Sequence, residues 1–154
     1  MKLDLLDTAK EVYSVILKDL SAYGGFPFYG VVILGALLFR SFDIAYSLAV
    51  SLVIVTIVVA AIRLSCFKPR PGMPKKKYSS VYERIDNSSF PSIHAARAVM
   101  ISMLFYSVMP VLFPLLFALV LAVLLSRIYF KRHDAVDLAV GCAIGLALGY
   151  FFFF

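Results

Sequence analysis

Histidine, arginine, serine and aspartate side chains gather in three short segments of this 154-residue chain, and as a set they could bind and transfer an oxyanion. Both histidines of the chain, His94 and His133, lie in these segments. Each residue taken singly has an ordinary structural explanation, because an arginine at the end of a membrane span snorkels and a serine caps a helix. The segments therefore matter in combination, and they comprise residues 63–71, 89–94 and 126–137.

His133 and Asp137 form the first chemical pair. They are four residues apart, so on a helix they share one side and the carboxylate can reach the imidazole. A carboxylate at the start of a membrane span is costly to bury without a partner, and His133 is an available one. An aspartate that fixes the orientation and basicity of a histidine is typical of nucleophilic and general-base roles.

Three arginines converge from separate parts of the motif region, and they indicate a bound oxyanion. Guanidinium groups match phosphate oxygens and would stabilise the added charge of a pentavalent transition state. The segments contain no recognisable set of metal ligands. Arg63, Arg70 and Arg127, together with two histidines and one aspartate, therefore predict phosphoryl transfer without a metal ion or other cofactor.

The order and spacing of the three segments resemble the signature of the type 2 phosphatidic acid phosphatase family, whose members share their site with vanadium haloperoxidases. That signature is Lys, six residues, Arg-Pro; then Pro-Ser-Gly-His; then Ser-Arg, five residues, His, three residues, Asp. In this chain the first part begins at Arg63 and ends at Arg70-Pro71, and the second is Pro-Ser92-Ile93-His94. The third part is Ser-Arg127 with His133 and Asp137 at the family's spacing.

The resemblance implies a role for each motif residue. It implies that His133 is the nucleophile that takes the phosphoryl group, with Asp137 holding its imidazole. It implies that His94 protonates the leaving group and later activates water as a base. The residues implied to cradle the phosphate are Arg63, Arg70, Ser92, Ile93 and Arg127.

Two motif positions depart from the family pattern. Arg63 replaces a lysine, which keeps the charge but introduces a bulkier fork. Ile93 replaces a glycine, and a β-branched residue does not easily adopt positive φ. We expect an ordinary helical start at Ile93, with its N–H still directed at the phosphate.

The composition excludes a disordered, fibrous or ordinary soluble protein, since 62% of the residues are hydrophobic and the mean hydropathy is +0.94. Long uncharged runs are typical of membrane spans, which need about 20 apolar residues. The longest run, Ala98–Ser126, contains Pro110 and Pro114, so we expect two spans that meet near Pro110. The sequence thus predicts an all-α membrane protein, a five-span helical bundle with spans at about 22–39, 44–62, 91–109, 111–130 and 135–154.

The first 20 residues predict an amphipathic helix that lies on the bilayer surface. Apolar residues recur at steps of three and four, and seven charged residues occupy the other face and exclude a span. A helix that packs on the soluble-facing part of the protein is the alternative. We therefore divide the chain into an interfacial helix, residues 1–21, and one transmembrane phosphatase domain, residues 22–154, with motif loops 63–94 and 126–137.

Five spans would place the amino-terminal helix, the long 63–90 segment and the 127–134 loop on one face of the membrane. That face carries 13 of the 15 basic residues; the exceptions are Arg97, inside the third predicted span, and Arg40, on the other face. By the positive-inside rule this face, and the site on it, are predicted to be cytoplasmic. The net charge of +6 then reflects topology and a phosphate site, and we expect no nucleic-acid partner.

A site at the bilayer surface suits a phosphate attached to a lipid. The lysine run 75–77, with Tyr78, Tyr82 and Arg84, is a candidate holder of an anionic headgroup, although topology and attraction to anionic lipid explain the run equally well. The expected activity is hydrolysis of a lipid phosphomonoester or diphosphate: polyprenyl diphosphate, phosphatidic acid or phosphatidylglycerol phosphate. The alternatives are a lipid-to-lipid phosphotransferase that uses the same site and a non-catalytic lipid-binding or transport protein.

Overall fold

The computed structural model describes residues 2–72 and 80–154, with side chains from Asp7 onward. The described residues form helices and one isolated bridge, between Pro69 and Ser88. An all-α protein was predicted, and this fold class is confirmed. The helices are α1 (Lys2–Leu20), α2 (Phe26–Leu38), α3 (Phe42–Ser65), α4 (Val81–Asn87), α5 (Ile93–Val108), α6 (Phe113–Tyr129) and α7 (Ala135–Phe153), with short 3-10 turns η1 (Ser21–Gly24) and η2 (Pro110–Leu112).

Three helical segments among the described residues are long and apolar enough to cross a membrane: α3, η2 with α6, and α7. A fourth span results if Asp7–Gly24 and α2, which meet at 52°, are counted together. Helices α2 and α5 lie within two predicted spans but have only 13 and 16 residues. At 1.5 Å per residue they rise about 20 and 24 Å, which is less than the roughly 30 Å of the hydrocarbon core.

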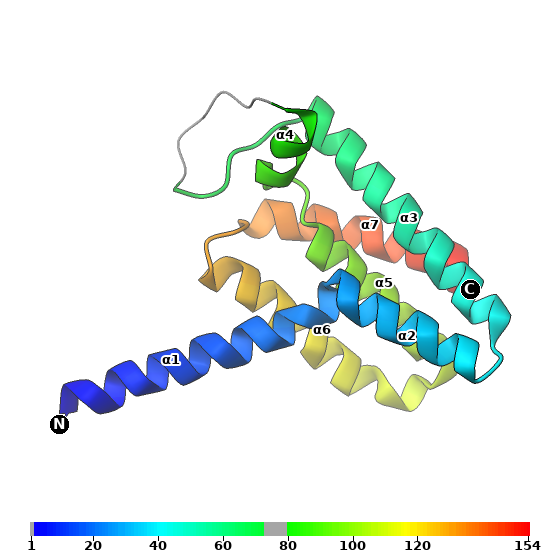
Figure 1. The fold of residues 1–154 in the computed structure, drawn as a ribbon, viewed down its shortest axis with the longest axis horizontal. Coiled ribbons are helices and arrows are strands. Elements are labelled where there is room, and N and C mark those ends of the chain that lie inside the picture. Colours follow the sequence, from blue (N-terminus) through cyan, green and yellow to red (C-terminus); the bar gives the residue numbers. More distant parts are fainter. Residues whose placement is uncertain (1, 73–79) are drawn as a thin grey trace.

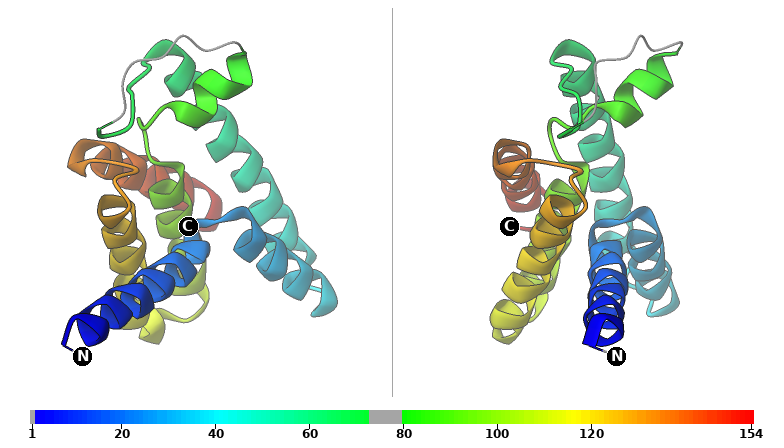
Figure 2. Two further views of the ribbon diagram at one scale, coloured as in Figure 1. Left: turned by 60° about the vertical axis from the view of Figure 1, so that its left-hand side comes forward. Right: turned by 90° about the vertical axis from the view of Figure 1, so that its left-hand side faces the viewer.

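Helix α5 is the central element of the bundle. It packs against α3, α6 and α7, and in both views of Figure 2 α6 and α7 lie on one side of the molecule with α2 and α3 on the other. Figure 1 shows that the α3–α5 connection and the α6–α7 loop lie at one end of the bundle. The α2–α3 turn, the α5–α6 turn and the carboxyl terminus lie at the opposite end. The predicted motif loops are therefore brought to the same end.

A buried arginine ties α5 to its neighbours. Arg97 is 2% exposed, and its Nη2 donates a hydrogen bond to Thr56 Oγ1 of α3 at 2.9 Å. Its guanidinium carbon lies 3.6 Å from the ring centroid of Phe26 of α2, a cation–π contact. The hydroxyl of Tyr29 donates to the carbonyl oxygen of Arg97 at 2.8 Å. These contacts hold α5 in place at Arg97, about one helical turn after His94.

Glycines at every fourth position of α7 allow α5 to approach it closely. A Cβ atom at Gly141 would collide with the carbonyl oxygen of Ser92, and one at Gly145 would collide with that of Ala96. Small residues have this effect in membranes, where helix association depends on close packing because lipid tails are themselves apolar. The glycine spacing therefore sets the distance between the two helices that carry the second and third motif segments.

Helix α1 is present where an amphipathic helix was predicted. Leu17 is buried, whereas Val12, Val15 and Ile16 remain half exposed. The ring of Tyr13 packs edge-on against that of Tyr129 in α6, with centroids 5.4 Å apart. The end of α1 is thus attached to the bundle, and Figure 1 shows the rest of the helix projecting from the end that carries the motif loops.

The α5–α7 contact predicts a position-specific effect of one methyl group. Gly145→Ala should lower the free energy of unfolding by about 1–3 kcal/mol, because the carbonyl oxygen of Ala96 belongs to a helix backbone and cannot move aside. Thermal unfolding in detergent measures this effect. Gly35→Ala in α2 is the matched control, since nothing lies within 4 Å of its added Cβ. Equal melting temperatures for the two variants would contradict the packing described.

Candidate active site

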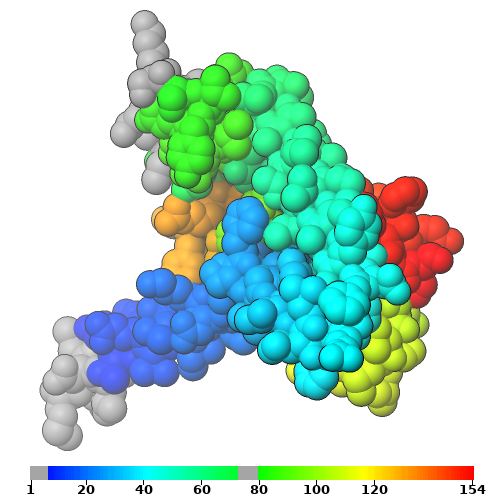
Figure 3. All heavy atoms as spheres, turned by 45° about the vertical axis from the view of Figure 1, so that its right-hand side comes forward, coloured from blue at the N-terminus to red at the C-terminus, as the bar shows by residue number. Residues whose placement is uncertain are grey.

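A cavity of about 580 Å³ lies where the end of α1, the α3–α5 connection and the α6–α7 loop meet. Figure 3 views the molecule from a side on which the α6–α7 segment (orange) is visible between α1 (blue) and α4 (green). All three motif segments contribute to the wall. The lining residues are Lys18, Ser21, Arg63, Arg70, Asp86, Ile93, His94, Arg127, Phe130, Arg132 and His133.

Most of the predicted site residues face this cavity, and two do not. Ser92 and Asp137 have no exposed surface and lie outside the lining. The two histidines and three arginines of the motif therefore share one space, with a buried serine and a buried aspartate behind them. The predicted residues in the wall are Arg63, Arg70, Ile93, His94, Arg127 and His133.

The start of α5 is built by Ser92 and Ile93. The hydroxyl of Ser92 accepts the N–H of Ala95 at 3.4 Å and so caps the helix, while its own N–H donates to the carbonyl of Asp137 at 3.0 Å. Ile93 is the first residue of α5, and among the described non-glycine residues only Arg40 and Lys131 have positive φ. Isoleucine in place of glycine thus requires no left-handed backbone, and the helix start can still direct N–H groups at an anion.

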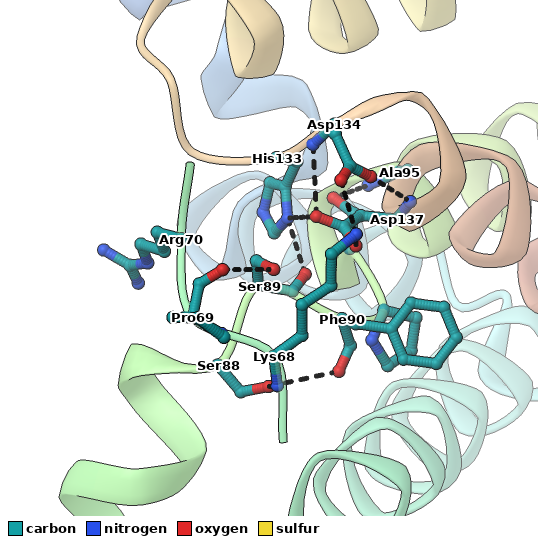
Figure 4. Close-up of polar contacts among 12 residues, drawn as sticks. Lys68, Pro69, Arg70, Ser88, Ser89, Phe90, Ala95, His133, Asp134 and Asp137 are labelled. Atoms are coloured by element: carbon teal, nitrogen blue, oxygen red, sulfur yellow. Dashed lines mark hydrogen bonds and ion pairs between the residues drawn. The ribbon is translucent and has the colours of Figure 1, made fainter. Parts of the chain in front are cut away.

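The α6–α7 loop fixes His133 through both its backbone and its ring. The carbonyl oxygen of Arg127 accepts the N–H of Arg132 at 2.9 Å and that of His133 at 3.4 Å, with Lys131 in the left-handed conformation that ends α6. The ring Nδ1 lies 2.7 Å from the carbonyl oxygen of Ser89 (Figure 4). Because a carbonyl oxygen can only accept, Nδ1 carries the proton, and the lone pair of the neutral ring is on Nε2.

Asp137 lies close to His133 without a hydrogen bond between them, since its Oδ2 is 3.7 Å from Nδ1. Oδ2 accepts the N–H of Asp134 at 3.1 Å, and Asp134 in turn accepts the N–H of Asp137 at 3.1 Å, which forms a capping box. Oδ1 accepts a hydrogen bond from Nζ of Lys68 at 2.8 Å. Sequence reasoning predicted the Asp137–His133 proximity but missed Lys68, Ser89 and Asp134.

Arg63 and Arg70 hold the α4–α5 connection while they face the cavity. Arg63 is buried, and its Nε and Nη2 donate to the carbonyl of Pro91 at 3.3 and 3.0 Å. Its Nη1 donates to the carbonyl of Ile85 at 3.0 Å. Nη2 of Arg70 donates to the carbonyl of Asp86 at 2.6 Å. The first motif segment is therefore joined to the segment that leads into the second.

Part of the predicted headgroup site, the lysine run 75–77 with Tyr78, lies outside the described residues. Tyr82 is 79% exposed on α4, and Arg84 donates to the carbonyl of Leu64 at 3.0 Å. Neither side chain lines the cavity. The headgroup role of this group stays a prediction.

The amino-terminal helix contributes to the cavity, which sequence reasoning missed. Lys18 and Ser21 line the wall from the end of α1 and from η1. A Cβ atom at Gly24 would collide with the carbonyl oxygen of His94, so η1 lies directly against the start of α5. The glycine pair Gly24-Gly25 after an amphipathic helix was the available signal for such a close approach.

The cavity is strongly cationic, and this suits a phosphate and a neutral nucleophile. Burial lowers the pKa of His133 to about 4, so its imidazole is uncharged at neutral pH. Among the described residues of the lining, Asp86 is the one with an acidic side chain. The basic residues of the lining are Lys18, Arg63, Arg70, Arg127 and Arg132.

The lowered pKa of His133 can be measured directly, because the chain has only two histidines. In the His94→Gln variant the remaining imidazole resonances belong to His133, and NMR in detergent should give a pKa of about 4. The protonated ring forms only below that pH, so His133 should hold its lone pair through the whole neutral range. A midpoint at or above the ordinary value of about 6.5 would contradict the burial described.

Comparison with known proteins agrees with this geometry. No curated protein matches the chain, but residues 28–154 match the PAP2 superfamily. The fold is similar to that in the crystal structure of LpxE from Aquifex aeolicus, with a TM-score of 0.74 and 22% sequence identity over 91% of this chain and 84% of the other. The resemblance that the motif spacing indicated is therefore confirmed. Because the superfamily match covers most of its length, the chain belongs to the PAP2 superfamily and is a lipid phosphatase of the membrane.

Proposed function

We propose that the protein hydrolyses a lipid phosphomonoester or diphosphate through a phosphohistidine at His133, without a metal ion. The observation that carries this proposal is the hydrogen bond from Nδ1 of His133 to the Ser89 carbonyl at 2.7 Å. It leaves the lone pair on Nε2 of a ring that lines an arginine-rich cavity. Such a nucleophile is neutral, oriented and next to cations that attract its substrate.

The proposed reaction has two steps. Nε2 attacks phosphorus, and the bond between phosphorus and the lipid oxygen breaks. The oxygen keeps the electron pair of that bond and receives a proton from His94. Asp137, 3.7 Å from Nδ1, stabilises the positive charge that develops on the ring. A water molecule then attacks phosphorus and gives a proton to His94. The phosphorus–nitrogen bond breaks, and its electron pair returns to Nε2. Arg70 and Arg127, with Arg63 and the helix start at Ser92-Ile93, hold the phosphate oxygens in both steps.

A second cavity supports a lipid substrate. It has a volume of about 510 Å³, lies among α5, α6 and α7, and is lined mainly by apolar side chains. Its α6 residues run from Phe113 to Leu124, a rise of about 16 Å, which is close to one leaflet of the hydrocarbon core. Arg127 follows Leu124 by about one turn of the same helix, so a chain in this cavity would end near the phosphate site. Polyprenyl diphosphate, phosphatidic acid and phosphatidylglycerol phosphate all have such a chain.

The proposed membrane placement keeps the five predicted spans, with α2 and α5 as the two short ones and α1 on the bilayer surface. The half-exposed apolar residues of α1 support the interfacial position. The concentration of basic residues at the motif end supports a cytoplasmic active site.

The function is tested by phosphate release in detergent from a panel of long-chain lipid phosphates and diphosphates. The purified protein should release phosphate without an added acceptor and with EDTA present, because arginine and histidine side chains supply the charge stabilisation. His133→Ala should lower the rate by at least about a thousandfold, since it removes the nucleophile.

Three outcomes would contradict the proposal. They are loss of activity in EDTA, a His133→Ala variant with an unchanged rate, and release that requires a second lipid as acceptor. Arg40 belongs to the α2–α3 turn, which lies at the opposite end of the bundle. Arg40→Ala is therefore the matched control for removal of a large polar side chain and should keep the wild-type rate.

A further inference from the structure

Lys68 lies between α3 and α4, outside the residues that the motif singled out, and it joins the motif segments. Its Nζ donates to Oδ1 of Asp137 at 2.8 Å and also contacts Oδ2 of Asp134 (Figure 4). The lysine side chain is 37% exposed, whereas that of Asp137 is 0% exposed. One ammonium group from the first motif segment thus bridges two carboxylates at the start of α7.

Asp137 is a buried carboxylate, so it needs a cation or several donors nearby. Its Oδ2 receives the backbone N–H of Asp134, and its Oδ1 receives Lys68. His133, which the motif resemblance pairs with this aspartate, is 3.7 Å away and donates its Nδ1 proton to Ser89 instead. The cation bonded to Asp137 is therefore Lys68.

The backbone of Lys68 also holds the group that orients His133. The N–H of Ser89 donates to the carbonyl oxygen of Lys68 at 2.8 Å, and the hydroxyl of Ser88 accepts the N–H of Lys68 at 3.4 Å. Figure 4 shows the lysine side chain running from this backbone past Ser89 to the two aspartates. Lys68 therefore contacts both neighbours of Nδ1, the Ser89 segment through its backbone and Asp137 through its side chain.

We propose that Lys68 is a positioning residue for His133: as the counter-ion of Asp137 it keeps this carboxylate turned away from Nδ1, so that the imidazole stays bonded to Ser89. The inference deepens the proposed function, since it matters for catalysis only if His133 is the nucleophile. Lys68 does not line the phosphate cavity, so it acts through Asp137 and not on the substrate.

The charges around Lys68 and its two aspartate partners are consistent with this positioning role. Although burial opposes it, hydrogen bonds to Asp134 and Asp137 raise the pKa of Lys68, and the bond to Lys68 lowers the pKa of Asp134. The ammonium of Lys68 and the carboxylate of Asp134 therefore stay ionised together across the neutral range. The charged groups that face His133 itself are Arg63 of α3, Asp137 of α7 and Arg127 of α6.

Lys68→Met tests the proposal in the full-length protein. Without its cation, Asp137 should turn to the nearest donor, His133 Nδ1, and draw the ring from Ser89. We expect kcat for phosphate release to fall by about tenfold to a hundredfold with KM within about threefold, because the nucleophile is displaced but the cavity lining is kept. Lys68→Arg should restore most of the rate. Lys10→Met, which removes an exposed lysine of α1, is the matched control and should change neither value.

The titration of His133 gives a second readout that needs no activity. In the His94→Gln background, Lys68→Met should raise the pKa of His133 by at least about one unit, since an unshielded carboxylate favours the charged ring. In an Asp137→Asn background, Lys68→Met should have little further effect on the pKa of His133, because the carboxylate that Lys68 neutralises is no longer there. That double variant also avoids an unpaired buried charge, and so keeps the test usable if Lys68→Met alone does not fold.

Two results would overturn the proposal: an unchanged kcat in Lys68→Met, whether or not KM rises, or a His133 pKa that does not respond to Lys68→Met. Failure of the proposed function is distinguishable from these results. A wild-type protein that releases no phosphate would refute the function, while the titration series would still show whether Lys68 governs the environment of His133.

Discussion

Backbone contact between α5 and α7, which glycine at every fourth position of α7 permits, fixes the distance between the second and third motif segments. At this distance the N–H of Ser92 reaches the carbonyl oxygen of Asp137 at 3.0 Å, and the starts of the two helices are joined. A side chain at Gly141 would separate them, since its Cβ would meet the Ser92 carbonyl. The relative position of His94 and His133 therefore depends on backbone packing between α5 and α7 as well as on the loops that carry the side chains.

The cations of the site serve the fold as well as the chemistry. Arg63 donates three hydrogen bonds to the carbonyls of Ile85 and Pro91, and Lys68 pairs with Asp137. These contacts hold the long α3–α5 connection over the ends of α5 and α7, at the cost of fewer free donors for a ligand. Removal of such a residue is expected to change the loop as well as the charge, so a loss of activity alone does not identify a phosphate ligand.

The sequence predicted those features that depend on side-chain type and local spacing. The five residues between Arg127 and His133 correspond to a turn in which the Arg127 carbonyl receives the N–H of His133, so the motif spacing already contained this geometry. Asp134, three residues before Asp137 and ahead of an apolar run, had the spacing of a capping box. The Ser89 carbonyl had no such signal, because every residue has a backbone oxygen. The partnership of Lys68 with Asp137 joins residues 69 positions apart and depends on how the loop returns.

The number of spans also shows which features can be predicted from local sequence and which depend on the three-dimensional fold. Hydropathy located the apolar segments, but α2 is shorter than the uncharged run that contains it, and α5 is shorter than the span predicted at 91–109. The chain breaks at η1 and Gly25 before α2, and α5 ends before Pro110. A count of uncharged residues does not detect the break before α2, whereas Pro110 already marked the end of α5 in the sequence.

The central claim, that His133 carries the phosphoryl group, is tested most directly by trapping the intermediate. A lipid substrate labelled in its phosphate should be mixed with the protein and quenched in alkali, in which a phosphohistidine is stable, before the protein is digested and the labelled peptide sequenced. The account predicts label on the peptide that contains His133, lost on acid treatment and absent from His133→Ala. Turnover of the substrate with no label on the protein, or with label on another residue, would contradict it.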